Sequence, residues 1–183
     1  MLILHGHEDA VRCLSYSPDG RWLASGSEDN TVRLWNLAAG GALAATLEHR
    51  MGAETLVFAS EGTRLFTGTS TGKLIEWDVA QQRKKTSVAG HTDGVRGMVC
   101  HGRTLVTAGW DQTIKRWDTI PLKQQSIIQQ GIPCTSLAFT PDGQTLAAAS
   151  SSSEVHLFEH EATPFLRDYF SPAFSLIWSP DGR

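Results

Sequence analysis

Three tryptophans recur at a nearly constant spacing, and this repeat constrains the fold of the 183-residue chain more than any other feature. Trp35, Trp77 and Trp117 are 42 and 40 residues apart, and Phe158 follows 41 residues later. Each ends a short run rich in β-branched and aliphatic residues, which is typical of a β-strand. Self-similarity at a fixed period of this length indicates a repeat architecture in which each unit packs against its neighbours.

A histidine accompanies each of the three tryptophans. His7 and His49 precede the tryptophan of their repeat by 28 residues, and His91 precedes its own by 26. The third repeat is shorter because a two-residue turn at 101–102 replaces the Ser-Pro-Asp-Gly sequence found at 17–20. Proline, aspartate and glycine each favour a tight turn, and hairpin loops tolerate such deletions.

Turn signals divide each repeat into four strand-like runs. In the first repeat we predict strands at Val11–Tyr16, Trp22–Ser27, Thr31–Trp35 and Ala42–Leu47. No segment shows the sustained periodicity of a helix. Four short strands in a repeat of about 41 residues are typical of a propeller blade. The predicted fold is therefore an all-β propeller built of four-stranded antiparallel blades.

The repeats resemble the WD-repeat family of β-propellers. Gly6-His7 and Gly90-His91 match the family's Gly-His pair, Trp77-Asp78 and Trp117-Asp118 match its Trp-Asp pair, and Trp35-Asn36 is a near match. The resemblance covers essentially the whole chain, with repeats at about 5–45, 47–87, 90–127 and 130–167 and a partial repeat at 169–183.

Family members usually have more blades than this, so the resemblance implies that the blades form an open arc. We expect the first strand of a fifth blade at 174–178, and Leu2–Leu4 as the outermost strand of a missing blade. The ends of such an arc expose apolar faces and unpaired strand edges. The chain is therefore expected to be part of a longer protein, and the alternative is self-assembly, in which copies pair into a complete ring.

The resemblance also implies a hydrogen-bond network within each blade. It joins a loop histidine, a hydroxyl of the second strand, an aspartate of the following turn and the tryptophan of the third strand. The matching residues are His7, Ser25, Asp29 and Trp35 in the first repeat, His49, Thr67 and Trp77 in the second, and His91, Thr107, Asp111 and Trp117 in the third. Buried polar groups need such partners.

Two repeats depart from this pattern. Thr71 replaces the aspartate in the second repeat, and we expect this replacement to weaken the orientation of His49. The fourth repeat has none of the four residue types, because Gln130, Ala148, Ser152 and Phe158 occupy the places. We expect that blade to hold by apolar packing alone and to be the softest of the four.

The polar residues also match two patterns of catalytic sites. Serine, histidine and aspartate together suggest a catalytic triad, but a duplicated set with a tryptophan member favours a structural role. The segment from His156 to His160 matches the H-x-x-E-H pattern of metalloproteases. That pattern needs a helix, and on a strand the two histidines would be ~13 Å apart. No catalytic residue, metal site or cofactor is predicted.

Partner binding is predicted on the face that carries the histidine loops and the turns between the second and third strands, which is a frequent partner site in the family. The candidate residues are Glu28, Ser70 and Trp110 in the turns and Asp9, Arg50 and Asp93 in the loops. An exposed Trp110 would be a typical interface anchor; the alternative is that it packs onto a neighbouring blade. For Arg12 and Arg96 we expect pairing with nearby carboxylates.

Composition excludes several other classes. The chain has 16 Lys and Arg against 19 Asp and Glu, a formal net charge of −3, so it lacks the basic footprint of a nucleic-acid binder. No apolar run approaches the ~18 residues of a membrane span. Three distant cysteines form no disulfide framework, which favours a reducing compartment and predicts a cytoplasmic location.

The predicted function is therefore a non-catalytic scaffold that presents loops to a protein or peptide partner. The alternative is a sensor or substrate-docking arm of a larger signalling enzyme, a kinase or an ATPase, whose catalytic domain lies outside these residues. Catalysis by the propeller itself would require a convergent acid–base pair, and the sequence shows none.

Overall fold

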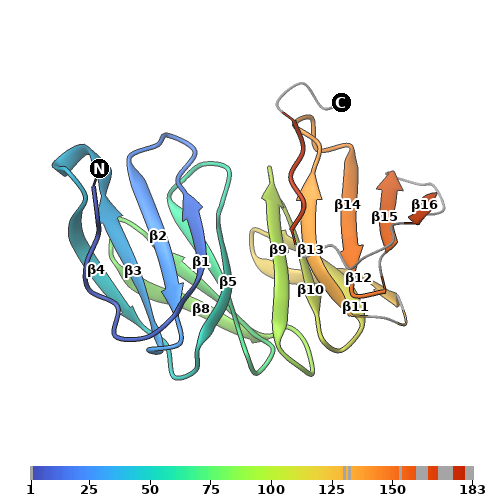
Figure 1. Ribbon diagram of the computed structural model, residues 1–183, viewed down its shortest axis with the longest axis horizontal. Helices are drawn as coiled ribbons and strands as arrows, with labels where there is room; N and C mark the ends of the chain where they lie inside the picture. The colour runs from blue at the N-terminus through green and yellow to red at the C-terminus, as the bar shows by residue number, and fades with distance from the viewer. Residues whose placement is uncertain are drawn as a thin grey trace. The chain divides into compact units, whose positions relative to one another are not determined.

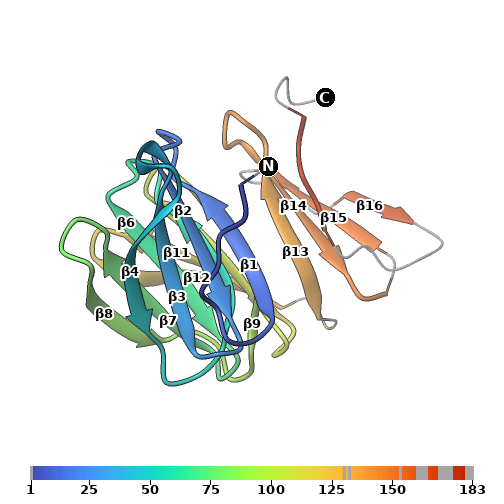
Figure 2. The same ribbon diagram turned by 60° about the vertical axis from the view of Figure 1, so that its left-hand side comes forward.

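The computed structural model describes residues 2–129, 131, 133–152, 154–159, 165–168 and 175–179. These residues form four antiparallel sheets of four strands each, and within every sheet the strands are ordered as in the chain (Figures 1 and 2). The chain divides into two compact units, residues 1–95 and 96–183. The predicted all-β fold with four-stranded antiparallel units is confirmed.

The strand bounds are as follows. Sheet one contains β1 (Val11–Tyr16), β2 (Trp22–Ser27), β3 (Thr31–Asn36) and β4 (Ala42–Glu48), and sheet two contains β5 (Ala53–Phe58), β6 (Arg64–Thr69), β7 (Lys73–Asp78) and β8 (Arg83–Ala89). Sheet three contains β9 (Val95–His101), β10 (Thr104–Gly109), β11 (Thr113–Thr119) and β12 (Leu122–Gln129). Sheet four contains β13 (Cys134–Phe139), β14 (Thr145–Ser150), β15 (Glu154–Glu159) and β16 (Phe165–Asp168), and one 3-10 turn, η1 (Leu37–Ala39), precedes β4.

The four strands predicted for the first repeat are confirmed to within one residue. Their first turn forms as its residue types require, because Asp19 accepts hydrogen bonds from the Ser17 hydroxyl (2.5 Å) and the Arg21 N–H (3.0 Å), while Gly20 has φ 68°. The shortened turn of the third repeat is also confirmed, since only residues 102–103 separate β9 from β10.

The two strands predicted at 2–4 and 174–178 stay predictions, because each would belong to a blade other than the four described sheets. Residues 2–4 and 175–179 do not join any of the four sheets. The side chains of Leu2 and Leu4 lie against Gly41 instead. Near the other end, the Leu176 N–H donates to the Ser136 hydroxyl (3.0 Å). A strand requires a paired backbone ladder, and an apolar run alone does not supply one.

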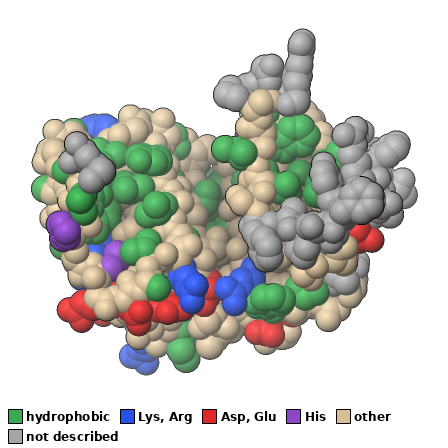
Figure 3. Space-filling model, viewed as in Figure 1, with side chains coloured by type: hydrophobic (Ala, Val, Ile, Leu, Met, Phe, Trp, Pro, Cys, Tyr) green, Lys and Arg blue, Asp and Glu red, His purple; other side chains and the backbone are tan. Residues whose placement is uncertain are grey.

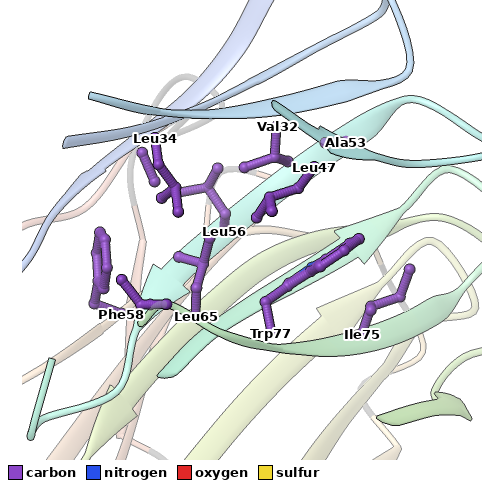
Figure 4. Packing of buried hydrophobic residues seen from close by; sticks show 11 residues of the cluster. Val32, Leu34, Leu47, Ala53, Leu56, Phe58, Leu65, Ile75 and Trp77 are labelled. Carbon is purple, nitrogen blue, oxygen red and sulfur yellow. The ribbon is translucent and has the colours of Figure 1, made fainter. Parts of the chain in front are cut away.

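The core of the first unit lies between sheets one and two. Val32 and Leu34 of β3 pack with Ala53, Leu56 and Phe58 of β5, and Figure 4 shows side chains from the two sheets pointing toward one another. In the second unit, Val106 and Ile114 of sheet three pack in the same way with residues of sheet four. Within each unit, the two sheets therefore bury one face each against one another.

The opposite face of sheet one is apolar and open. Leu14 and Tyr16 of β1 are 62% and 65% exposed, whereas Leu56 and Phe58, at the equivalent positions of β5, are 5% and 4% exposed. Figure 3 shows hydrophobic side chains gathered over this sheet. The equivalent positions differ because sheet one covers β5, while no described sheet covers β1.

Candidate functional site

The first sheet brings together the four residues of the predicted network. The indole Nε1 of Trp35 donates to the Ser25 hydroxyl (2.8 Å), and this hydroxyl lies 2.7 Å from Nε2 of His7. The other ring nitrogen, Nδ1, lies 2.8 Å from Oδ2 of Asp29. Because a carboxylate oxygen only accepts, Nδ1 carries the proton and donates to Asp29, which leaves Nε2 to accept from the Ser25 hydroxyl.

Asp29 is the most heavily hydrogen-bonded member of this network. Besides His7, its carboxylate accepts from the Glu8 N–H (3.0 Å) and from the Thr31 N–H (2.9 Å) and hydroxyl (2.7 Å). Burial opposes ionisation, but the hydrogen bonds from Thr31, His7 and Glu8 outweigh it and hold the pKa of Asp29 well below its usual range. Sequence reasoning missed Thr31, although a threonine also stands two residues after Asp111.

The second sheet forms half of this network. Trp77 Nε1 donates to the Thr67 hydroxyl (2.9 Å), which lies 3.0 Å from Nε2 of His49. The buried Nδ1 of His49 has no hydrogen-bond partner among the described residues. Thr71, at the aspartate position, instead lies 3.1 Å from the Thr69 hydroxyl. Burial, with a smaller repulsion from Lys84, lowers the pKa of His49 to about 4.

Sheet three has all four residue types of the network, whereas sheet four lacks them. In sheet three, Trp117 Nε1 donates to the Thr107 hydroxyl (2.9 Å), His91 is buried, and Asp111 accepts from the Thr113 hydroxyl (2.8 Å). In sheet four, Ala148 and Phe158 belong to the apolar core, and the Ser152 hydroxyl hydrogen-bonds Ser150 (2.9 Å). Gln130 lies outside the described residues, so that member of the fourth repeat is not placed.

The turn between β2 and β3 presents an ion pair. Arg12 is the extra residue of a β-bulge between Val11 and Cys13, and Glu54 has the same place in β5. A bulge of this kind redirects a side chain, and Arg12 Nε donates to Glu28 Oε1 at 2.7 Å. The expected pairing of Arg12 with a carboxylate is thus observed.

The equivalent turn of sheet three presents an aromatic side chain. Trp110 follows β10 and is 40% exposed, and the guanidinium carbon of Arg96 lies 5.2 Å from the centre of its ring. A guanidinium over an indole face is attractive by ~0.5–1 kcal/mol at an exposed site. The pair holds Trp110 at the surface of its turn, a contact that the sequence did not predict.

The remaining predicted partner residues are all exposed. Asp9 and Asp93 each accept a hydrogen bond from the N–H of the next residue, at 2.7 and 2.6 Å. Arg50 follows His49 in its loop, and Ser70 lies at the turn position equivalent to Glu28 and Trp110. Within each sheet these side chains occur at the ends where the first strand begins and the second strand ends.

The described residues contain no group of three or more His, Cys, Asp or Glu side chains that could hold a metal ion. His156 hydrogen-bonds Glu154 (3.1 Å) on β15, and His160 of the H-x-x-E-H pattern lies outside the described part of the chain. No helix in the described ranges is long and apolar enough to cross a membrane.

Comparison with known families agrees with the repeated geometry. The family pattern for WD40, described as WD domain, G-beta repeat, matches residues 1–36, 82–118 and 124–159. The chain belongs to the WD40 family. It is 32% identical over 180 residues to WD repeat-containing protein 90 of Xenopus tropicalis, an alignment that covers 94% of this chain and 10% of that protein.

Two further matches extend this comparison. The U3 small nucleolar RNA-associated protein 15 homolog of Gallus gallus is 28% identical to this WD40 chain, over 78% of the chain and 28% of that protein. A chain in the crystal structure of the mitotic checkpoint complex aligns with a TM-score of 0.89 and 21% identity, over 98% of this chain and 59% of that one. The WD40 chain spans between 10% and 33% of the length of the curated relatives it matches.

The prediction of a cytoplasmic location is wrong for this WD40 chain. The relative named for U3 small nucleolar RNA points to the nucleolus or nucleus instead of the cytoplasm. The error has a chemical reason. Unpaired cysteines indicate a reducing compartment, and both the cytosol and the nucleus are reducing.

Proposed function

We propose that this WD40 chain is a non-catalytic scaffold that binds a protein or peptide partner through its turns and loops. WD40 propellers bind protein partners, and the solved structure that this chain resembles is a protein complex. The β-strands supply rigid positions, while the turns between them carry the variable side chains. Such an arrangement suits binding of a partner better than catalysis.

Trp110 is the observation that carries the proposal. Tryptophan and arginine are the residue types most enriched at binding hot spots, and here Arg96 holds the indole in a turn where it remains partly exposed. The equivalent turn of sheet one carries the Arg12–Glu28 ion pair instead. The two turns therefore offer different chemistry, and we propose that the turn of sheet three anchors an apolar side chain of the partner.

The polar networks support a scaffold in preference to an enzyme. His7 and Asp29 are committed to Ser25 and Trp35 within one sheet. The Trp117–Thr107 hydrogen bond repeats the corresponding contact at nearly the same length in sheet three. A catalytic set must face a substrate, whereas these groups are buried or partly buried within their own sheets and complete one another's hydrogen bonds.

Site-specific photocrosslinking tests the proposal. A photoreactive aromatic amino acid in place of Trp110 should crosslink a discrete protein in cells, because an interface anchor lies within contact distance of its partner. The same amino acid in place of Ile127, an exposed residue of the outermost strand β12, is the matched control. Excess unmodified protein should compete the crosslink away.

The purified crosslinked partner then allows a binding measurement. Trp110→Ala should weaken its affinity at least ~30-fold, in line with a hot-spot loss of ~2 kcal/mol, without changing the urea midpoint of the scaffold. Equal crosslinking at positions 110 and 127, or unchanged affinity in Trp110→Ala, would show that this turn is not the binding site.

A further inference from the structure

The turn between β6 and β7 has the same backbone as its counterparts but lacks their acid. Asp29, Thr71 and Asp111 each stand two residues after the end of a second strand. The next residue has positive φ in every case, with values of 65°, 80° and 62°. Thr71 therefore lies in the same turn position from which Asp29 accepts the hydrogen bond from Nδ1 of His7.

The histidine beneath this turn retains a donor. The Thr67 hydroxyl accepts from the indole of Trp77 and lies 3.0 Å from Nε2 of His49. In the tautomer that His7 adopts, this hydroxyl donates to Nε2 and the N–H of His49 lies on Nδ1. No described residue accepts from that nitrogen, although His49 is buried. A buried donor without an acceptor is destabilising, so sheet two would gain stability from an acceptor at this place.

The neighbouring residues favour an anion here. In sheet one, the residue after the histidine is Glu8, whose N–H donates to Asp29. In sheet two that residue is Arg50, and the residue two places after Thr71 is Lys73. Sheet three has threonines at both places. Among these three sheets, sheet two is therefore the one that has basic residues at these two places.

We propose that Thr71 is a phosphorylation site and that phosphothreonine at this position completes the hydrogen-bond network of sheet two. Thr71 is exposed in a tight turn, so its hydroxyl is accessible to a protein kinase. Oγ1 attacks the γ-phosphorus of a nucleoside triphosphate, the new O–P bond forms as the bond to the bridging oxygen breaks, and the nucleoside diphosphate leaves. The hydroxyl proton passes to the base of the kinase, and nothing is oxidised or reduced.

A phosphoryl group on Thr71 supplies the negative charge and the acceptor oxygens that sheet two lacks at this turn. It adds about −1.5 to −2 charge and three strong acceptor oxygens, and it extends one bond further from Cβ than an aspartate carboxylate. One oxygen accepts from Nδ1 of His49, and the positive charges of Arg50 and Lys73 stabilise the others. The modification links the stability of sheet two to a kinase, independently of the binding function proposed for Trp110.

Ser70 provides a matched control one residue away. It is exposed in the same turn, but its counterpart in sheet one is Glu28, which pairs with Arg12 and not with the network. In sheet two the place of Arg12 is taken by Glu54. A phosphate on Ser70 therefore meets a like charge, while the same phosphate on Thr71 meets an N–H donor.

Hydrogen–deuterium exchange on the intact protein tests the proposal. We compare the unmodified protein with forms that carry genetically encoded phosphothreonine at 71 or phosphoserine at 70. Phosphothreonine 71 should slow amide exchange in peptides covering residues 64–78 about tenfold, as one charge-assisted hydrogen bond permits. Peptides covering residues 22–36 of sheet one should not change, and phosphoserine 70 should leave exchange in sheet two unchanged or faster.

A second variant keeps the test decisive if the modified protein is poorly folded. Thr71→Asp places a carboxylate at the position without a kinase, and it should also slow exchange in residues 64–78. Protection by Thr71→Asp without protection by phosphothreonine would show that the site accepts only a carboxylate and would overturn the proposal. Equal effects of phosphate at 70 and 71 would overturn it as well, because general charge would then explain both.

Discussion

A single substitution between equivalent turn positions changes how a buried histidine is satisfied. Asp29 gives Nδ1 of His7 an acceptor, whereas Thr71 hydrogen-bonds Thr69 and gives His49 none. The surrounding contacts are alike, since a tryptophan indole donates to a hydroxyl of the second strand in both sheets. At this scale, stability depends on whether each buried donor has an acceptor.

Removing the acid from sheet one should leave several donors without an acceptor. We expect Asp29→Ala to lower the free energy of unfolding by ~1–3 kcal/mol, because His7, Thr31 and the Glu8 N–H all donate to this carboxylate. Urea denaturation at neutral pH measures the loss. Asp9→Ala, at an exposed carboxylate bonded to the next N–H, is the control and should change stability little. If both variants lost the same free energy of unfolding, the network would not be the cause of the loss.

The pH dependence of sheet two should originate at His49. Burial lowers its pKa to about 4, whereas an unfolded histidine titrates near ~6.5. The unfolded state therefore binds the proton first as the pH falls. The contribution of neutral His49 is complete above pH ~6.5 and is lost by pH ~4, a change of up to ~3 kcal/mol.

Urea midpoints from pH 7 to 4 measure this effect. His49→Gln should flatten the dependence between these limits, because glutamine does not titrate. A slope in His49→Gln equal to that of the wild type would assign the acid sensitivity to another group.

At the scale of the strand, close contacts between neighbouring strands restrict side-chain size. Gly68 of β6 has its α-carbon against Val95 and Thr55, and an added Cβ would lie 2.7 and 2.9 Å from their side-chain atoms. The equivalent residue of β10 is Ala108, which is buried. The glycine is therefore required by close packing against Thr55 of β5 and Val95 of β9, and not by backbone conformation.

Gly68→Ala should accordingly destabilise the protein by ~1–3 kcal/mol through overpacking. Gly52→Ala is the control, because the nearest atom to its new Cβ would be the Glu28 α-carbon at 3.8 Å, an ordinary contact. Thermal denaturation of both variants measures the difference. A neutral Gly68→Ala would show that Val95 moves aside without cost.

At the scale of the whole molecule, a neighbouring sheet decides what each repeated residue contributes. Leu14 and Leu56 occupy the same place in consecutive repeats and have the same side chain. Leu56 packs with Leu34 and Val32 in the core between sheets one and two, whereas Leu14 lies on the open face of sheet one. Burial of one leucine side chain contributes roughly 1.5–3 kcal/mol, so equivalent positions are not equivalent in energy.

Leu56→Ala should therefore lower the free energy of unfolding by ~2–5 kcal/mol. Leu14→Ala should change it by no more than ~0.5 kcal/mol, as exposed substitutions do. Chemical denaturation of the two variants under identical conditions makes the comparison. A loss at Leu14 as large as that at Leu56 would show that another surface covers the open face of sheet one.

The sequence by itself determined the repeat and the four strands of sheet one, and its resemblance to the WD-repeat family implied the network around Trp35. These features depend on alternation, turn residues and partners within one sheet, all of which lie close along the chain. The tertiary structure decided that Leu14 is exposed while Leu56 is buried, that Arg96 stacks on Trp110, and that Leu2–Leu4 joins no sheet. Such outcomes depend on which surface lies opposite a residue, and a repeating sequence assigns the same residue pattern to faces that meet different surroundings.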